Sequence, residues 1–313
     1  MAPPDALPRE DRMTGWMDDR ISGSSDVASA YLAELRRWTA VDTSSSAPAL
    51  RAALVAQLRA AQAAQPTLAL IHQLGTRALS VVDSGLTRGD STAELRRHLD
   101  ESCAAELSDL AAVRRAVSRL AVELFTQRAA WIATLSYSTA VRDAVLEAQR
   151  MGRQPRVLVA ESRPRFEGRA LAASLAEAGI TTWLVVDAAL PILVAQAHLV
   201  WIGADAVTDR GVLNKVGSYA LALAAREHSV PVYALAERRK FIPADTPALR
   251  IDEMPAEEVW DAPVPGVRPR NIYFELVPMA LLRGVVVEDA VLPPGEAAAI
   301  ARERALPAEL SKG

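Results

Sequence analysis

Apolar residues in the first half of the chain recur at intervals of three and four positions. The segments DVASAYLAELRRWTA (26–40), PALRAALVAQLRAAQ (48–62) and AELSDLAAVRRAVSRLAVELF (105–125) show this spacing, which is typical of amphipathic helices. We therefore expect a helical domain of roughly five or six helices over residues 21–150. Residues 1–20 combine three prolines with many charges, which favours a mobile arm before the first helix.

After the turn-like segment MGRQPR the pattern changes to short apolar runs rich in β-branched residues. These runs are RVLVAES (156–162), TTWLVVD (181–187), HLVWIGAD (198–205), VPVYALA (230–236) and GVVVE (284–288), and helical patterns such as GRALAASLAEAG lie between them. Alternating strands and helices indicate crossover units and a parallel sheet covered on both faces. We expect residues 151–313 to form a Rossmann-like, doubly wound α/β domain.

Composition and charge exclude several classes of protein. The only cysteine, Cys103, cannot form an intramolecular disulfide, and this fits a reducing cytoplasm. The N-terminus has no apolar run that resembles a signal peptide, and no uninterrupted apolar run reaches the about 18 residues of a membrane span. We expect a soluble, cytoplasmic protein without membrane association. The net charge of −3 gives no general attraction to nucleic acid, so direct binding is not expected.

The common site motifs are also missing. The four histidines are scattered along the chain, and none stands at metal-ligand spacing from another, so a metal site is not expected. The sequence lacks a GxGxxG segment after a strand, a GxxxxGK[ST] loop and a GxSxG elbow. It therefore predicts no nucleotide cofactor and no serine-hydrolase triad.

Polar clusters instead follow three of the predicted strands, at residues 161–169, at Asp187 and at residues 205–218. In open parallel sheets, ligands bind at the carboxyl ends of the strands. The segment GADAVTDRGVLNKVGS (203–218) places Asp205 near the Asn214–Lys215 pair. If a helix begins at this pair, its N-terminus and the lysine would favour a phosphate, with Asp205 as an acid or base. Alternatively, Asp209 and Gly211 form a turn, the asparagine caps the helix and the lysine is solvated.

Two other segments leave the same kind of choice open. In ESRPRFEGR (161–169), the arginines Arg163 and Arg165 could bind an anion in bidentate fashion, or they could begin a solvated helix. In TLSYS (134–138), the hydroxyl groups could donate to a phosphate or cap the helix that follows.

An ordered series of segments resembles a known family. ESRPRFEGR, GITTWLVVDAA, IGADAVTDRGVLNKVGSYALA, VPVYALAERRKF and NIYFELVP occur in this order. They resemble the family that joins the α, β and δ subunits of eukaryotic translation initiation factor 2B to aldose-1-phosphate isomerases. These isomerases act on methylthioribose 1-phosphate and ribose 1,5-bisphosphate. DRISGSSDVASAYLAEL and QPTLALIHQL resemble the family's N-terminal helical segments, so the resemblance covers about residues 19–294.

The resemblance implies a phosphosugar cleft between the helical and Rossmann-like domains, and a homodimer formed through the C-terminal domains. The isomerases use a cysteine and an aspartate to convert a sugar 1-phosphate to a ketose 1-phosphate. The aspartate corresponds to Asp205, and the substrate-contacting Asn-Lys pair to Asn214 and Lys215. Arg163 matches the arginine of the family's RPxxxGR segment. The complete set of implied substrate-binding residues is Arg163, Glu167, Asn214, Lys215, Gly23 and Gln65.

Three positions depart from the isomerase pattern. Ser136 replaces the cysteine of the Thr-His-Cys segment, and a hydroxyl is less acidic and less nucleophilic than a thiol. Gln65 replaces the arginine of an N-terminal RPT segment, which removes a charge-assisted phosphate contact. Glu167 stands where the isomerases often have glutamine. The segment TLSYS instead resembles the factor 2B subunits, which also lack the cysteine.

Three hypotheses for the function follow. In the first, the protein is a factor 2B-like relative that binds a phosphorylated sugar or nucleotide with weak or no isomerase activity. In the second, it is an active aldose-1-phosphate isomerase in which Asp205 and Ser136 are the catalytic residues. In the third, it is a subunit of a translation initiation or nucleotide exchange complex. The Ala- and Arg-rich composition hints at a bacterial source, where the eukaryotic factor has no partner.

Overall fold

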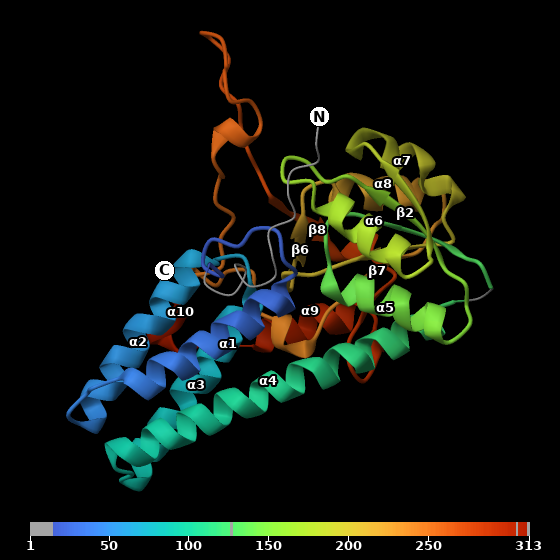
Figure 1. Ribbon diagram of the computed structural model, residues 1–313. Coiled ribbons are helices and arrows are strands. Elements are labelled where there is room, and N and C mark those ends of the chain that lie inside the picture. Colours follow the sequence, from blue (N-terminus) through green and yellow to red (C-terminus); the bar gives the residue numbers. More distant parts are fainter. Residues whose placement is uncertain (1–14, 126–127, 305, 312–313) are drawn as a thin grey trace.

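The computed structural model of the protein describes residues 15–125, 128–304 and 306–311. Its first part is a group of four helices: α1 (Ser24–Val41), α2 (Ala47–Ala64), α3 (Ala69–Arg88) and α4 (Thr92–Glu123). Figure 1 shows α4 lying along α1 and α3 and continuing beneath α5. The expectation of a helical first part is confirmed.

The ends of these helices follow from local sequence signals. Ser91 caps α4, and the Glu94 side chain accepts a hydrogen bond from the Ser91 backbone N–H, so the two residues form a capping box. Gly89 ends α3 with a φ of 82°, a left-handed conformation that glycine adopts without steric cost. These two signals produce the tight connection between α3 and α4.

The core of the helical part receives residues from both ends of the described chain. Trp16 and Leu310 are buried in the same cluster as the apolar faces of α1 to α4. The short helix α10 (Ala308–Ser311) contacts α2, and Glu309 forms an ion pair with Arg51 of α2. Figure 1 shows the C-terminal end beside α2. The chain therefore returns to the helical part after it leaves the sheet.

The second part is built on a seven-stranded sheet with the strand order β10-β9-β7-β4-β1-β2-β3. All neighbouring strands are parallel except β10 and β9. The strands are β1 (Trp131–Thr134), β2 (Arg156–Ala160), β3 (Thr181–Val185), β4 (Leu199–Ile202), β7 (Val232–Leu235), β9 (Gly284–Val286) and β10 (Val291–Leu292). The expected doubly wound, Rossmann-like sheet is confirmed, and the order of its parallel strands reverses between β1 and β4.

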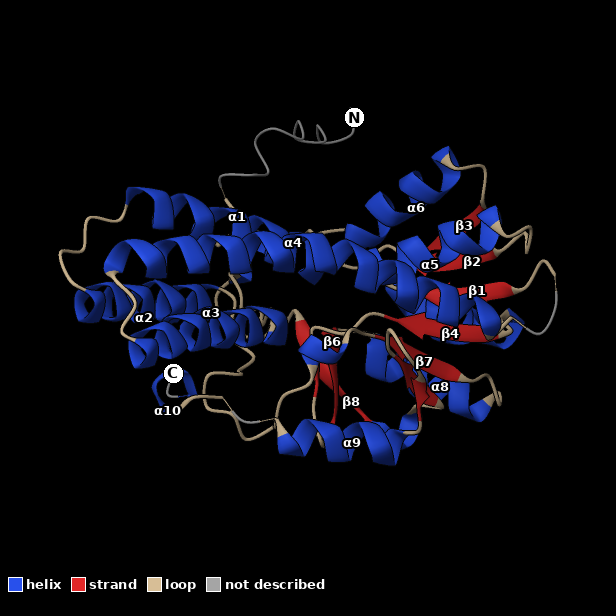
Figure 2. Ribbon diagram, turned by 90° about the horizontal axis from the view of Figure 1, so that it is seen from below, coloured by secondary structure: helices blue, strands red, loops and turns tan. Residues whose placement is uncertain are grey.

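Helices cover both faces of this sheet (Figure 2). On one face, α4, α5 (Thr139–Arg150) and α6 (Glu167–Glu177) pack against one set of strand residues. On the other, α7 (Leu190–Leu193), α8 (Ser218–Glu227) and α9 (Pro294–Glu303) pack against the alternate set. Adjacent strand residues point to opposite faces, which explains why Leu158 belongs to one cluster while Val157 and Val159 belong to the other.

A small antiparallel sheet lies beside the large one and contains β5 (Ala206–Val207), β6 (Gly211–Lys215) and β8 (Phe274–Pro278). Its presence corrects the expectation for residues 205–218. Asn214 and Lys215 end strand β6, paired with Glu275 and Phe274 of β8, and α8 begins three residues later at Ser218. The Asn-Lys pair is therefore not at a helix start.

The large sheet begins earlier in the chain than the expected boundary at residue 151. Strand β1 begins at Trp131, and β1 and α5 pack within the sheet layers, although residues up to 150 were expected in the helical domain. Of the arm expected at residues 1–20, residues 1–14 lie outside the described part. The following turn is packed onto the body through buried Trp16.

Among the described helices, none is both long and apolar enough to cross a membrane.

Candidate functional site

A cavity lies at the point where the strand order of the large sheet reverses. It measures about 50 Å³ and is lined by the loops after β1 and β4, the N-terminus of α1, strand β6 and the start of α6. Seven of the eight site residues expected from the sequence line it: Gly23, Gln65, Ser136, Glu167, Asp205, Asn214 and Lys215. Open α/β sheets bind ligands at this reversal, so the fold and the expected residues indicate the same place.

Asp205 follows β4 and is held by its backbone on two sides. Its N–H donates to Leu213 O of β6 (2.8 Å), and its carbonyl accepts from Ala69 N at the start of α3 (3.0 Å). Burial raises the pKa of the Asp205 carboxyl to about 6, against the opposing effects of Lys240, Lys215 and a hydrogen bond with Ser24. A carboxyl with a pKa near neutral pH is suited to exchanging protons.

Lys240 lies behind Asp205 in the short helix that follows β7. Its Nζ donates to Ser24 Oγ (2.7 Å) and to Ala204 O (2.8 Å), and the residue is 3% exposed. Burial lowers the pKa of Lys240, while Glu237 and Asp205 oppose this shift. The lysine thus joins the α1 N-terminus to the end of β4 on the inner side of the cavity.

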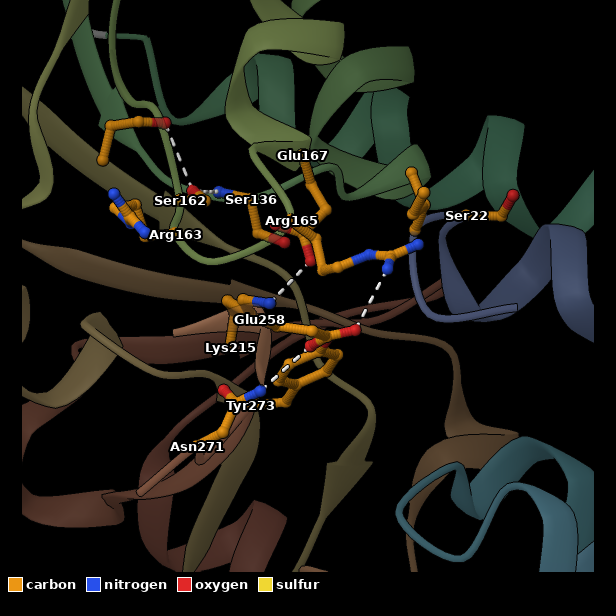
Figure 3. A network of polar contacts seen from close by, with 12 residues as sticks. Ser22, Ser136, Ser162, Arg163, Arg165, Glu167, Lys215, Glu258, Asn271 and Tyr273 are labelled. Atoms are coloured by element: carbon orange, nitrogen blue, oxygen red, sulfur yellow. Dashed lines mark hydrogen bonds and ion pairs between the residues drawn. The ribbon is translucent and has the colours of Figure 1, made fainter. Parts of the chain in front are cut away.

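Lys215 and Glu167 form a buried ion pair across the cavity wall (Figure 3). Lys215 Nζ lies 2.6 Å from Glu167 Oε1, and the two side chains are 4% and 3% exposed. Lys215 Nζ also lies 4.1 Å from the centre of the Tyr273 ring, a favourable cation–π distance. Glu167 Oε2 is buried without a hydrogen-bond partner within the described residues. The alternative in which Lys215 is solvated is therefore wrong.

Through the Tyr273 ring, the ion pair is next to a second group of polar contacts (Figure 3). The Tyr273 hydroxyl donates to Glu258 Oε2, which also accepts from Asn271 Nδ2 at 2.9 Å. Glu258 Oε1 pairs with Arg165 Nη1 at 3.0 Å. Arg165 is thus paired with a carboxylate, whereas the anion site suggested for Arg163 and Arg165 stays a prediction.

Ser136 follows β1 and is positioned by the loops after the next two strands. Its backbone has a φ of 62°, and its N–H donates to Ser162 Oγ at 2.7 Å. Ser162 N and Arg163 N in turn donate to the two carboxylate oxygens of Asp187, at 2.7 and 2.8 Å. The polar residues after β1, β2 and β3 therefore form one hydrogen-bonded chain that fixes the serine at the cavity. Outside this network, Ser138 caps α5 by accepting from Val141 N, as the capping alternative requires.

Asn214 has a partly structural role. Its Nδ2 donates to Ser218 Oγ (2.8 Å), and Ser218 Oγ donates to Lys215 O (2.6 Å). These bonds join the end of β6 to the start of α8 across the bend at Gly217, which has a φ of 101°. Asn214 is 5% exposed and lines the cavity. Its Oδ1 atom takes no part in the two bonds described above.

Gln65 and Arg20 hold the segment that covers the cavity. Gln65 Nε2 donates to the carbonyls of Trp16 (2.9 Å), Met17 (3.1 Å) and Asp19 (2.9 Å). Arg20 donates to Met17 O (2.7 Å), Asp19 O (3.2 Å) and Ala64 O (2.8 Å). The amide nitrogen of Gln65 is therefore used by the chain itself, whereas Arg20 lines the cavity with only neutral carbonyl partners.

Gly23 immediately precedes α1 and allows a close approach to α5. A Cβ atom at this position would lie 2.2 Å from Thr139 Oγ1, a distance that no side chain tolerates. The first N–H groups of α1 have no partner within the helix. Ser22, Gly23 and Ser24 line the cavity, so the positive end of the α1 dipole faces it.

Arg163 is the exception among the eight expected residues. It is exposed, does not line the cavity, and its guanidinium lies 5.3 Å from the Phe166 ring centre. In Figure 3 its side chain lies apart from the Lys215–Glu167 pair. The sequence analysis instead missed Arg20 and Lys240. Both occur in segments that carry the family resemblance, DRISGSSD and ERRKF, but spacing gave no sign that either would reach the cavity.

The described part of the chain contains no group of three or more His, Cys, Asp or Glu residues arranged to hold a metal ion. The side chains at the cavity supply a carboxyl of raised pKa, a buried ion pair, two further cations and hydroxyl groups.

Comparison with known proteins identifies relatives of two kinds. The model of the initiation factor 2 subunit family matches residues 20–294. A protein of Pyrococcus furiosus, likened in its name to translation initiation factor eIF-2B subunit 2, is 37% identical over 166 residues. A ribose 1,5-bisphosphate isomerase of Archaeoglobus fulgidus is 34% identical over 172 residues. The matches cover 52% and 53% of this chain and 58% and 55% of those proteins, so the chain spans just over half the length of these relatives.

Solved structures show the same fold over most of the chain. The Pyrococcus horikoshii translation initiation factor eIF-2B has a TM-score of 0.77 and 24% identity, with 92% of this chain and 98% of that chain covered. The 5-methylthioribose 1-phosphate isomerase of the same organism has a TM-score of 0.72 and 20% identity, with 93% and 86% covered. The fold is thus common to proteins named as initiation factors and as isomerases.

Proposed function

The chain belongs to the initiation factor 2 subunit family, and on this premise we propose that it binds a phosphorylated sugar or nucleotide in the cavity around Asp205, with weak or no isomerase activity. The observation that carries the proposal is the composition of the cavity. Arg20 and the N-terminus of α1 present positive charge to the cavity, while Ser136 occupies the position that the resemblance assigns to the catalytic cysteine. A serine hydroxyl is almost fully protonated near neutral pH and is a weak nucleophile without a base.

The cavity must open to admit such a ligand. Its volume of about 50 Å³ holds one or two water molecules, and the segment at residues 15–22 is held over it by Gln65 and Arg20. Backbone carbonyls are the partners of both side chains, so a phosphate can replace them as the acceptor for Arg20. A phosphate brings a full negative charge and bidentate geometry to the guanidinium, which a backbone carbonyl does not, and this supports ligand-driven opening.

The test is a binding and turnover measurement on the same protein. Isothermal titration calorimetry with ribose 5-phosphate, ribose 1,5-bisphosphate and methylthioribose 1-phosphate should detect binding of at least one of them. Proton and phosphorus NMR should detect no ketose, or only slow formation. Arg20→Met should weaken binding at least tenfold, while Arg169→Met, an exposed arginine paired with Glu161, should leave it unchanged. If no phosphorylated sugar or nucleotide binds, the proposal is wrong.

Active isomerisation is the second candidate, and the raised pKa of Asp205 favours it. A carboxyl with a pKa of about 6 can accept and return a proton at neutral pH. Ketose formation that is abolished by Asp205→Asn and reduced by Ser136→Ala, with binding retained in both variants, would establish this candidate in place of the first.

The proposal includes a homodimer formed through the α/β part. Strand β3 is an edge of the large sheet, and it and its neighbouring segment expose apolar side chains. Their exposed fractions are 49% for Trp183, 45% for Leu184, 59% for Val186 and 75% for Ile192. An exposed apolar group at a sheet edge is typical of an association surface.

A further inference from the structure

The buried pair of Lys215 and Glu167 has a consequence for the charge of the ligand. A cation that faces a phosphate site is expected to be free to bind phosphate. Lys215 is instead neutralised at 2.6 Å by a carboxylate that is 3% exposed. Any ligand phosphate that approached Lys215 would also approach this carboxylate, and two like charges in a poorly hydrated site repel each other strongly.

The remaining charges of the cavity are also nearly balanced. The lining contains the carboxylates of Asp19, Glu167 and Asp205 together with the cations Arg20 and Lys215. Lys240 lies directly behind Asp205 and contributes the third cation. A cavity that is already close to neutral can compensate one phosphate through the α1 N-terminus, but it has no charge to compensate a second one at the other end.

Arg20 and the start of α1 lie together in the cavity wall. Arg20 has only backbone carbonyls as partners among the described residues, and it lies beside the N-terminus of α1, which is formed by Ser22, Gly23 and Ser24. Backbone N–H groups at the start of an 18-residue helix and an arginine together form a typical phosphate site.

The start of α6 contributes an acceptor without a donor to the cavity wall. Glu167 Oε2 is buried and has no hydrogen-bond partner in the part of the chain that the structure describes, whereas Oε1 accepts from Lys215. Burial also raises the pKa of the Glu167 carboxyl, against the opposing effect of Lys215. A buried carboxylate oxygen without a donor is costly, so a ligand that supplies an O–H group there gains a charge-assisted hydrogen bond.

We propose that Glu167 selects a singly phosphorylated polyol over a bisphosphate: the phosphate binds at Arg20 and the α1 N-terminus, and a ligand hydroxyl donates to Glu167 Oε2. This inference rests on the proposed binding function and adds the charge class of the ligand. Glu167 is a specificity-determining residue in this arrangement, because its carboxylate fills the position where a second phosphate would meet Lys215.

The test compares ribose 5-phosphate with ribose 1,5-bisphosphate by isothermal titration calorimetry. The wild-type protein should bind the monophosphate at least tenfold more tightly. Glu167→Gln keeps an oxygen that accepts from Lys215 Nζ but removes the charge, so it should shift the affinity ratio at least tenfold toward the bisphosphate. Glu161→Gln is the matched control: Glu161 precedes the same helix and pairs with Arg169 outside the cavity, and its loss should not change the ratio.

The outcomes separate this inference from the proposed function. If both ligands bind and the wild type prefers the bisphosphate, or if the ratio is the same in Glu167→Gln, the selection by Glu167 is refuted while the binding function stands. If neither ligand binds to any of the proteins, both are refuted. A gain of bisphosphate binding in Glu167→Gln alone supports the selection. Melting temperatures verify that each variant is folded. If Glu167→Gln is unfolded, the wild-type affinity ratio for the two ligands alone tests the inference: a preference for the monophosphate supports it, and a preference for the bisphosphate refutes it.

Discussion

Because Lys215 and Glu167 form a buried ion pair, we expect their contributions to the free energy of unfolding to depend strongly on each other. We also expect the loss of Glu167 to cost more than the loss of Lys215. Glu167→Leu removes the counter-charge from a lysine whose side chain is 4% exposed. Breaking a buried pair costs about 3–5 kcal/mol, and the Tyr273 ring at 4.1 Å continues to stabilise the ammonium, so we expect about 3 kcal/mol at pH 7. Lys215→Met should cost less, about 2 kcal/mol, because Glu167 has a raised pKa and can take up a proton when its partner is lost.

The double variant Lys215→Met/Glu167→Leu tests the reasoning. Replacement of a buried ion pair by apolar side chains of similar size is often neutral, so the double variant should lie within about 1 kcal/mol of the wild type. The coupling energy would then be at least about 4 kcal/mol. Urea unfolding at pH 7, followed by both tryptophan fluorescence and circular dichroism, measures all four proteins. Additive losses in the double variant would show that the two side chains do not stabilise each other.

Four further predictions follow from the described geometry. The pKa of Asp205 is raised to about 6, so the folded protein holds this proton more tightly than the unfolded chain does. The resulting stabilisation of the folded state is complete below about pH 4 and is lost as the pH rises to 6. The unfolding free energy of the wild type relative to Asp205→Asn should accordingly fall by about 1–3 kcal/mol over that range. Burial lowers the pKa of His72 to about 4, so its effect on stability has the opposite pH dependence: the free energy of unfolding is highest above pH 6.5 and falls toward pH 4. In urea titrations at several pH values, His72→Gln should remove on the order of 3 kcal/mol of this fall. Gly23→Ala should destabilise the protein by about 1–3 kcal/mol, because its Cβ would lie 2.2 Å from Thr139 Oγ1, and Thr139→Ala should partly restore the melting temperature; full stability of the single variant would contradict the contact. Trp183→Glu should convert the proposed homodimer to a monomer in light scattering coupled to size-exclusion chromatography, and an unchanged mass would place the interface elsewhere.

Most of the large sheet could be predicted from the sequence because its inner strands are buried on both faces. Such strands consist of continuous β-branched runs, as in RVLVA and LVWI. Strand β1 was missed because WIAT has only four residues and lies between long helical patterns. Strand β6 was read as a loop because its sequence, GVLNK, ends in two polar residues. Those residues are polar because they line the cavity, so the functional site itself obscured the strand.

Most of the residues around the candidate cavity were expected from the sequence, but the contacts between them were not. The carboxyl ends of parallel strands meet at one edge of a sheet, and this brings Ser136 and Asp205 to one cavity. Contacts between distant segments leave no local signal, as for Lys215 and Glu167, which are 48 positions apart. Arg163 was placed by its match to the family pattern, but its side chain turns outward to the Phe166 ring. Which way a side chain turns depends on tertiary packing that a motif does not encode.

The burial of Leu310 beside the helices of the first part bears on how the protein folds during synthesis. Leu310 is fully buried, in the same cluster as Trp16 and the helices α1 to α4. The helical core therefore stays incomplete while the ribosome makes the whole sheet, about 180 residues, at roughly 5–20 residues per second. During these seconds a gap beside α2 remains open to other apolar segments. The helical core is thus synthesised first but completed last, because it needs Leu310 from the end of the described chain.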